Sequence, residues 1–103
     1  MASPKKIAVL GSTGSIGCST LDVAAASRGR IEVMALAANS NARRLLEQAN
    51  EFRPAWIALA DEQAADEIRS SDLPRETQLL TGEEALQRLA RLRPRLRARR
   101  LLW

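Results

Sequence analysis

Three glycines near the start of the chain are spaced by three residues and follow a short apolar run. Gly11, Gly14 and Gly17 come directly after residues 7–10, which read Ile-Ala-Val-Leu. Such a continuous apolar run is typical of a strand buried on both faces of a parallel sheet. Glycine permits a sharp turn after the strand, leaves room for a pyrophosphate group and lets the next helix pack closely. The pattern therefore predicts a phosphate-binding turn for a nucleotide cofactor.

The spacing G-x-x-G-x-x-G differs from the commoner G-x-G-x-x-G and is a weak signal when taken alone. Its place between a predicted strand and a predicted helix strengthens it. A helix that begins here would direct its free N–H groups and the positive end of its dipole toward an anion. We expect cofactor contacts from the following residues of the turn: Gly11, Thr13, Gly14, Ser15, Ile16 and Gly17.

A second polar group, Asn39, Ser40 and Asn41, follows the predicted strand at 31–38. In a Rossmann-type sheet the residue that closes the second strand meets the adenosine ribose, and an acid there selects NAD(H). This segment has no carboxylate, and Arg43 and Arg44 follow it, so we predict NADP(H) over NAD(H). Asparagine and serine can donate hydrogen bonds to a 2′-phosphate, and either arginine could pair with it. The alternative is that the polar residues only cap a helix and the arginines only face solvent.

Strand and helix patterns alternate along most of the chain. Predicted strands cover 7–10, 31–38, 55–60 and 77–80. Predicted helices cover 15 to about 27, 42–52, and a stretch from a cap at Asp61 to about residue 69. A fourth helix follows a predicted capping box of Thr81 and Glu84. Short connections in this order indicate an α/β fold, a Rossmann-type doubly wound parallel sheet of about four βα units and therefore incomplete.

Composition and charge limit the alternatives. A hydrophobic share of 46% with only 3% aromatic residues predicts an aliphatic, alanine-rich core. We interpret the single cysteine, Cys18, as a small buried residue rather than a reactive thiol. The sequence has neither a signal peptide nor an apolar run long enough to span a membrane, so we expect a cytoplasmic protein.

The net charge of +4 comes from the end of the chain. Six of the 16 basic residues lie in 91–103, which has no acid, and the rest of the chain carries 10 basic against 12 acidic residues. We predict a nucleotide-binding domain over residues 1–91 and an arginine-rich tail outside it over residues 92–103.

The first motif resembles a known family. Residues 7–23, Ile-Ala-Val-Leu-Gly-Ser-Thr-Gly-Ser-Ile-Gly-Cys-Ser-Thr-Leu-Asp-Val, are similar to the start of 1-deoxy-D-xylulose 5-phosphate reductoisomerases, and the similarity covers about residues 5–90. The resemblance implies an NADPH-dependent oxidoreductase of isoprenoid biosynthesis. In the non-mevalonate pathway such an enzyme converts 1-deoxy-D-xylulose 5-phosphate to 2-C-methyl-D-erythritol 4-phosphate.

Residue by residue, the resemblance assigns residues 13–16 to the family's NADPH pyrophosphate loop. Asn39, Ser40 and Asn41 fall where the family binds the ribose and its 2′-phosphate. Family members often have glycine in place of Asn39 and a basic residue in place of Ser40. We therefore expect the phosphate contact to depend on Asn41 and Arg43.

The resemblance also implies a divalent metal, Mg²⁺ or Mn²⁺, a sugar-phosphate substrate and a homodimer. The family's metal-binding carboxylates lie beyond the first hundred residues, so we assign no catalytic and no metal-binding residue to this sequence. After residue 92 a family member should enter another hydrophobic strand, whereas this chain is rich in arginine. We interpret the sequence from about residue 92 as out of frame, and the polypeptide as a truncated nucleotide-binding part that is inactive alone.

Two other interpretations stay open. One is another NADP-dependent reductase or epimerase with the same glycine spacing, which the length of the first motif disfavours. The other is a nucleic-acid-binding module that uses the arginine tail to neutralise phosphates and release counterions. The tail offers only Trp103 for stacking on bases, which disfavours specific nucleic-acid binding.

Overall fold

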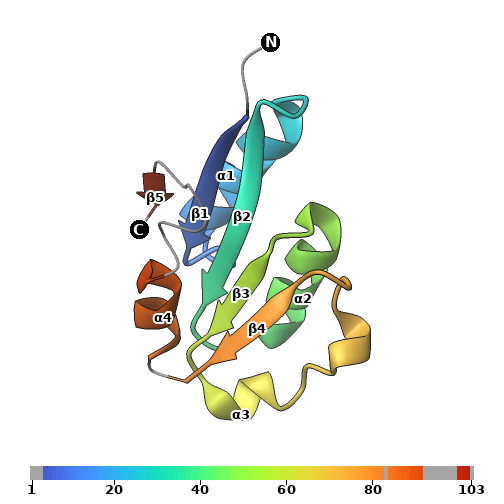
Figure 1. Ribbon diagram of the computed structural model, residues 1–103, viewed down its shortest axis with the longest axis vertical. Helices are drawn as coiled ribbons and strands as arrows, with labels where there is room; N and C mark the ends of the chain where they lie inside the picture. Colours follow the sequence, from blue (N-terminus) through green and yellow to red (C-terminus); the bar gives the residue numbers. More distant parts are fainter. Residues whose placement is uncertain (1–3, 83, 92–99, 103) are drawn as a thin grey trace.

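The computed structural model describes residues 4–82, 84–91 and 100–102 of the 103-residue chain. Five parallel strands form one sheet in the order β4-β3-β2-β1-β5 (Figure 1). The strands are β1 (Lys5–Leu10), β2 (Ile31–Ala38), β3 (Trp56–Leu59), β4 (Gln78–Thr81) and β5 (Arg100–Leu102). Strands β1 to β4 progress in one direction across the sheet, and β5 lies on the other side of β1. The strand order therefore reverses at β1, and ligands of open α/β sheets bind at such a switch point.

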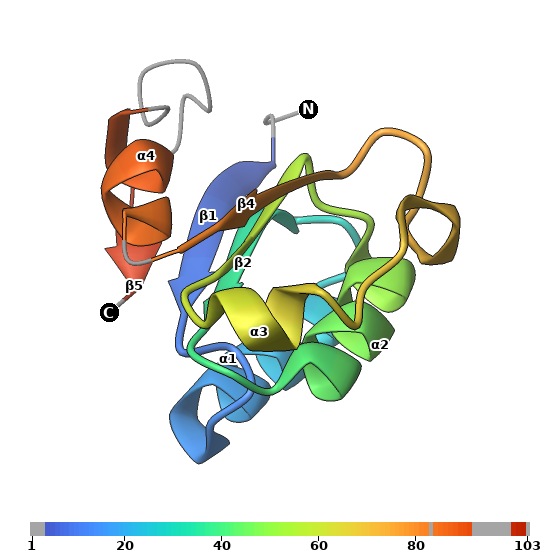
Figure 2. The same ribbon diagram turned by 90° about the horizontal axis from the view of Figure 1, so that it is seen from below.

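Helices cover both faces of the sheet (Figure 2). They are α1 (Ser15–Ala26), α2 (Ala42–Phe52), the short α3 (Glu62–Ala65) and α4 (Ala85–Arg91), with a 3-10 turn at Ser70–Asp72. Helices α1, α2 and α3 pack on one face, and α4 packs on the other. None of the helices in the described ranges is both long and apolar enough to cross a membrane.

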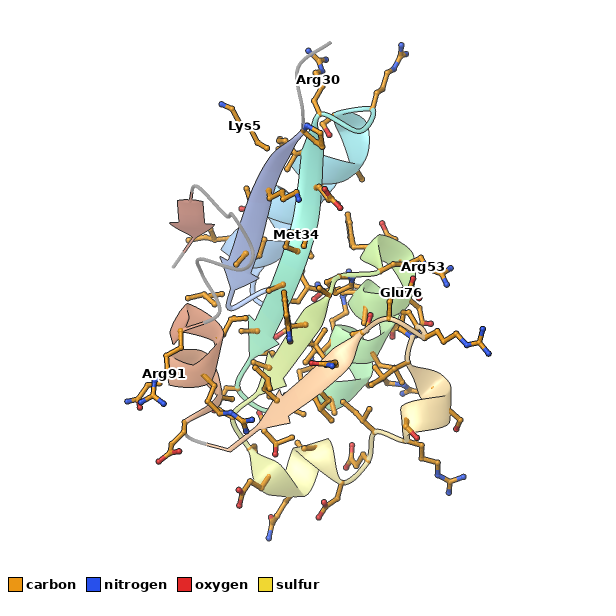
Figure 3. The ribbon with its side chains drawn as sticks, in the orientation of Figure 1. Lys5, Arg30, Met34, Arg53, Glu76 and Arg91 are labelled. Atoms are coloured by element: carbon orange, nitrogen blue, oxygen red, sulfur yellow. The ribbon has the colours of Figure 1, made fainter. Side chains whose placement is uncertain are left out.

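The two sheet faces differ in the size of their side chains. The face under α1 and α2 carries large aliphatic residues, among which Leu36, Ile57 and Leu59 are fully buried with Leu45 of α2. The opposite face is rich in alanine and packs against α4. Alanine brings α4 close to the sheet, but one short helix leaves Met34 of β2 only half-buried on this face (Figure 3).

The structure confirms the fold class and most of the expected elements. Strand β2 and helix α2 have the predicted bounds, and α1 begins at the predicted residue. The prediction of one helix over residues 61–69 is wrong, because α3 ends at Ala65. Beyond it the chain continues in tighter turns, in which the N–H groups of Glu67 and Ile68 bond three residues back. This path packs Ile68 against the core.

The predicted capping box is also wrong. Thr81 is the last residue of β4 and lies four residues before α4, which begins at Ala85, so it is not the residue that caps this helix. Pairing of Thr81 with Leu59 of β3 therefore takes the place of the predicted helix cap.

An ion pair connects two segments at the other end of the strands. Arg53 at the end of α2 pairs with Glu76 of the segment before β4 at 3.4 Å (Figure 3).

The segment predicted to lie outside the domain contributes a strand. Residues 100–102 form β5, which pairs with β1 in parallel through Ile7, Ala8 and Val9. The sheet thus has one strand more than the four expected. Residues 92–99 and 103 lie outside the described residues, and the division of the chain at residue 91 stays a prediction.

We expect Leu36→Ala to lower the free energy of unfolding by about 2–5 kcal/mol, because it removes a fully buried side chain and leaves a cavity between β2 and its covering helices. Urea denaturation followed by circular dichroism measures this loss. The control is Val23→Ala on α1, where the side chain is 61% exposed and the expected change is within about 0.5 kcal/mol. Equal losses in the two variants would contradict this account of the core.

Candidate functional site

The glycine turn connects the end of β1 to the start of α1. Gly11 has φ +69°, a left-handed conformation that favours glycine. The Gly14 N–H donates to the Gly11 carbonyl at 3.0 Å, and the Ser12 N–H donates to the Ala37 carbonyl of β2 at 2.9 Å. The turn is therefore closed on itself and tied to the neighbouring strand. It lies at the carboxyl end of β1, where the strand order reverses.

Gly14 and Gly17 have different roles in this turn. A Cβ added to Gly17 would come within 2.6 Å of the Ser12 Cα and still closer to the Gly11 carbonyl oxygen. A Cβ on Gly14 would meet only the Gly11 carbonyl oxygen, at an ordinary contact distance of 3.4 Å. Gly17 thus lets α1 pack against the turn itself, whereas Gly14 is exposed and leaves space on the outer side.

The start of α1 offers unpaired donors to an anion. The first N–H groups of a helix have no partner within it, and Gly14 at the N-cap position supplies no side-chain acceptor. The first turn, Ser15 to Gly17, also has no acidic residue. A groove of about 220 Å³ lies here, lined by Val9, Leu10, Gly11, Gly14, Ser15, Ile16, Gly17 and Thr20. The arrangement is suited to a phosphate or pyrophosphate group, and the half-buried Thr13 lies in the same turn.

The second predicted group lies at the carboxyl end of β2. Asn39, Ser40 and Asn41 are all exposed there. Asn41 is the N-cap of α2, and its Oδ1 accepts from the Arg44 N–H at 3.1 Å. Asn41 therefore caps α2, and its contact with a cofactor stays a prediction. In the part of the chain that the structure describes, the side chains of Asn39 and Ser40 make no hydrogen bond.

The two arginines of α2 have different surroundings. Arg44 forms an ion pair with Glu47 at 3.1 Å. Contacts with the Cys18 thiol and with Glu47 raise the pKa of Arg44 above its ordinary value, so this guanidinium is already engaged. Arg43 is exposed and makes no ion pair with any described residue. Of the two candidates, Arg43 is therefore the better placed to meet an added phosphate.

Two acids that the sequence analysis did not select lie beside Asn39. A cleft of about 620 Å³ is lined by Asn39, Ala60, Asp61, Glu62 and Gln63, at the carboxyl ends of β2 and β3. The Asp61 N–H donates to the Asn39 carbonyl at 2.8 Å. The Asp61 carboxylate accepts from two N–H groups at the start of α3. The segment after β2 thus has no carboxylate, as expected, but the cleft beside it contains the carboxylates of Asp61 and Glu62.

The sequence did contain a signal for these acids. Neighbouring parallel strands end at the same edge of a sheet, so the residue after β3 must lie near the residue after β2.

No group of three or more metal-ligating side chains, His, Cys, Asp or Glu, gathers anywhere in residues 4–82, 84–91 and 100–102. The candidate site thus consists of the glycine turn with its groove and a polar cleft.

The parallel sheet with its glycine turn at the switch point defines a Rossmann-type nucleotide-binding unit. A family model described as 1-deoxy-D-xylulose 5-phosphate reductoisomerase matches residues 7–95. The chain belongs to this family. This finding confirms the resemblance seen in the first motif.

Reductoisomerases from two bacteria illustrate the relationship. The protein of Anaeromyxobacter sp. (strain K) is 48% identical over 79 residues, which cover 77% of this chain and 20% of the relative. The protein of Nitrosospira multiformis is 42% identical over 96 residues, which cover 89% of this chain and 24% of the relative. The chain therefore spans between a fifth and a quarter of the length of these relatives.

Solved structures of reductoisomerases share the fold. The Zymomonas mobilis enzyme, in complex with NADPH, has a TM-score of 0.78 and 32% identity, over 87% of this chain and 24% of its own. A reductoisomerase in complex with NADPH, fosmidomycin and magnesium has a TM-score of 0.71 and 34% identity, over 84% of this chain and 21% of its own.

We expect Gly17→Ala to destabilise the fold strongly, because the added methyl group overlaps the backbone of the turn. The expected loss is about 2–3 kcal/mol in free energy of unfolding, as for other overpacked sites. Gly14→Ala is the matched control, with an expected loss below about 1 kcal/mol. Thermal or urea unfolding of both variants measures the difference, and a Gly14 variant as unstable as the Gly17 variant would refute it.

Proposed function

We propose that this chain is the NADPH-binding part of a 1-deoxy-D-xylulose 5-phosphate reductoisomerase. The single observation that supports this most is the glycine turn, which directs the open end of α1 to a groove at the switch point of the sheet. The Zymomonas mobilis enzyme, at 32% identity, is in complex with NADPH, and this supports the same cofactor here.

The two halves of the site fit the two halves of such a cofactor. In this proposal the N–H groups at the start of α1 bind the pyrophosphate, and the polar cleft at the ends of β2 and β3 takes the adenosine side. Asn39, Ser40 and Asn41 contact the ribose and its 2′-phosphate. The Asp61 carboxylate already accepts two hydrogen bonds from α3, which reduces its repulsion of a phosphate nearby.

The whole reaction of the family is part of the proposal. Reduction of 1-deoxy-D-xylulose 5-phosphate to 2-C-methyl-D-erythritol 4-phosphate takes a hydride from NADPH, and the bound cofactor supplies that chemistry. This chain's own residues hold and orient the cofactor. The described residues include no metal-binding cluster, so no step through Mg²⁺ or Mn²⁺ is assigned to them. A cytoplasmic location and a homodimer of the longer enzyme also stay predictions.

We expect the chain to prefer NADPH over NADH, and Arg43→Gln to reduce that preference. Loss of a charged hydrogen bond to the 2′-phosphate should raise the Kd for NADPH about tenfold and leave the Kd for NADH nearly unchanged. Titration of the nicotinamide fluorescence gives both constants. Arg75→Gln is the matched control, because Arg75 is an exposed arginine before β4, at the opposite end of the strands.

An Arg43 variant that binds both cofactors as the wild type does would exclude a 2′-phosphate contact at this residue. Equal affinity of the wild type for NADPH and NADH would refute the choice of cofactor itself.

We expect the 103-residue chain to bind NADPH without catalysing the reductoisomerase reaction, because the described residues provide no metal cluster. The measurement is NADPH oxidation, followed by the loss of its near-ultraviolet absorbance, with 1-deoxy-D-xylulose 5-phosphate and Mg²⁺ or Mn²⁺ present. A full-length family enzyme is the positive control. Turnover by the purified chain alone would contradict the proposal that it is only the cofactor-binding part.

A further inference from the structure

A buried glutamine connects α2 to the glycine turn. Gln48 is 2% exposed, and its Nε2 donates to the Ser12 carbonyl oxygen at 2.8 Å. Ser12 is itself fully buried and stands inside the turn, between Gly11 and Gly14. The hydrogen bond joins residues 36 positions apart in the sequence. It is therefore a tertiary contact and not part of the local geometry of the turn.

Both the N–H and the carbonyl group of Ser12 are held by hydrogen bonds. The Ser12 N–H donates to the Ala37 carbonyl of β2 at 2.9 Å, and the Ser12 carbonyl accepts from Gln48 of α2. The Cys18 sulfur of α1 lies 3.6 Å from the same carbonyl oxygen and 3.7 Å from the Gln48 Nε2. Both helices thus contact the Ser12 carbonyl, and the neighbouring strand β2 binds the N–H of the same residue.

The burial of Gln48 leaves polar atoms without hydrogen-bond partners in the part of the chain that the structure describes, which lowers the stability of the fold. The Gln48 Oε1 and the Ser12 Oγ are both buried, and neither has a hydrogen-bond partner among the described residues. A buried polar group without a partner destabilises the fold, and an apolar side chain of the same length would avoid that cost. The amide donor therefore has a role beyond filling space.

We propose that Gln48 is a positioning residue for the cofactor site. By holding the Ser12 carbonyl, it fixes the turn so that the N–H groups at the start of α1 point into the groove that takes the pyrophosphate. The inference rests on the proposed function, because the ligand is the NADPH proposed above. Gln48 also follows Asn41 by seven residues on α2, so one helix supports both halves of the site.

The test compares Gln48→Met with Thr77→Val. Methionine keeps the length of the side chain and removes the amide donor. Thr77 is the matched control, because its buried hydroxyl also donates to a distant carbonyl, that of Pro54 at 2.6 Å, at the other end of the strands. The Kd for NADPH is measured by fluorescence, and the fraction of folded protein by urea unfolding. Exchange of the Ser12 and Gly14 amide hydrogens is measured in the cofactor-free protein.

We expect Gln48→Met to raise the Kd for NADPH about tenfold in the folded protein and to speed exchange at Ser12 and Gly14 by a similar factor. Thr77→Val should change neither quantity beyond its effect on the folded fraction. If Gln48→Met does not fold, Gln48→Asn, whose amide is one methylene too short to reach Ser12, has the same expected result.

The measurements distinguish a failure of the Gln48 proposal from a failure of the proposed function. Wild-type affinity and wild-type exchange in the Gln48 variant would overturn the positioning role and leave the proposed function intact. Equal weakening of NADPH binding in the Gln48 and Thr77 variants would show a general loss of structure and also overturn it. A wild-type chain that binds no NADPH would overturn the proposed function and, with it, the role of Gln48 toward that cofactor.

Discussion

The close approach of α1 to the turn before it is the constraint on which the site depends. Gly17 is buried against the backbone of Gly11 and Ser12, with no room for a side chain. This contact sets the direction in which α1 leaves the sheet, and so the direction of its first N–H groups. Gly11 also has a left-handed φ, which glycine adopts at little cost, so the turn depends on glycine at both positions. The donors at the start of α1 are thus aligned before any ligand binds.

The two faces of the sheet differ in the size of the side chains that β1 and β2 place on them. Strands β1 and β2 alternate large aliphatic residues with alanines, so that Val9 and Leu36 face α1 and α2 while Ala8 and Ala37 face α4. Large side chains fill the space under two long helices, whereas alanines suit a single helix packed close to the backbone. The face that supports the turn and α2 therefore carries the larger aliphatic side chains of the core.

The sequence predicted those elements whose pattern is local. Strand β2 and helix α2 have the expected bounds because their apolar periodicity and the cap at Asn41 lie within the elements themselves. The sequence predicts one helix after Asp61, whereas α3 ends at Ala65 and tighter turns bring Ile68 against the core. No single stretch of the sequence shows that Asp61 lies beside Asn39 or that Gln48 contacts Ser12. Both depend on segments brought together by the sheet.

Helix α2 links the two parts of the candidate site, in addition to the hydrogen bond from the Ser12 N–H to the Ala37 carbonyl of β2. Its N-cap, Asn41, ends the polar segment that we propose for the adenosine side, and Gln48 on its buried face contacts the turn that we propose for the pyrophosphate. A helix is stiff over this length, so a displacement of one end moves the other by nearly the same amount. Helix α2 therefore helps to set the distance between the two proposed binding regions. A change at Gln48 should thus alter how well a dinucleotide spans the site, even though this residue contacts no ligand itself.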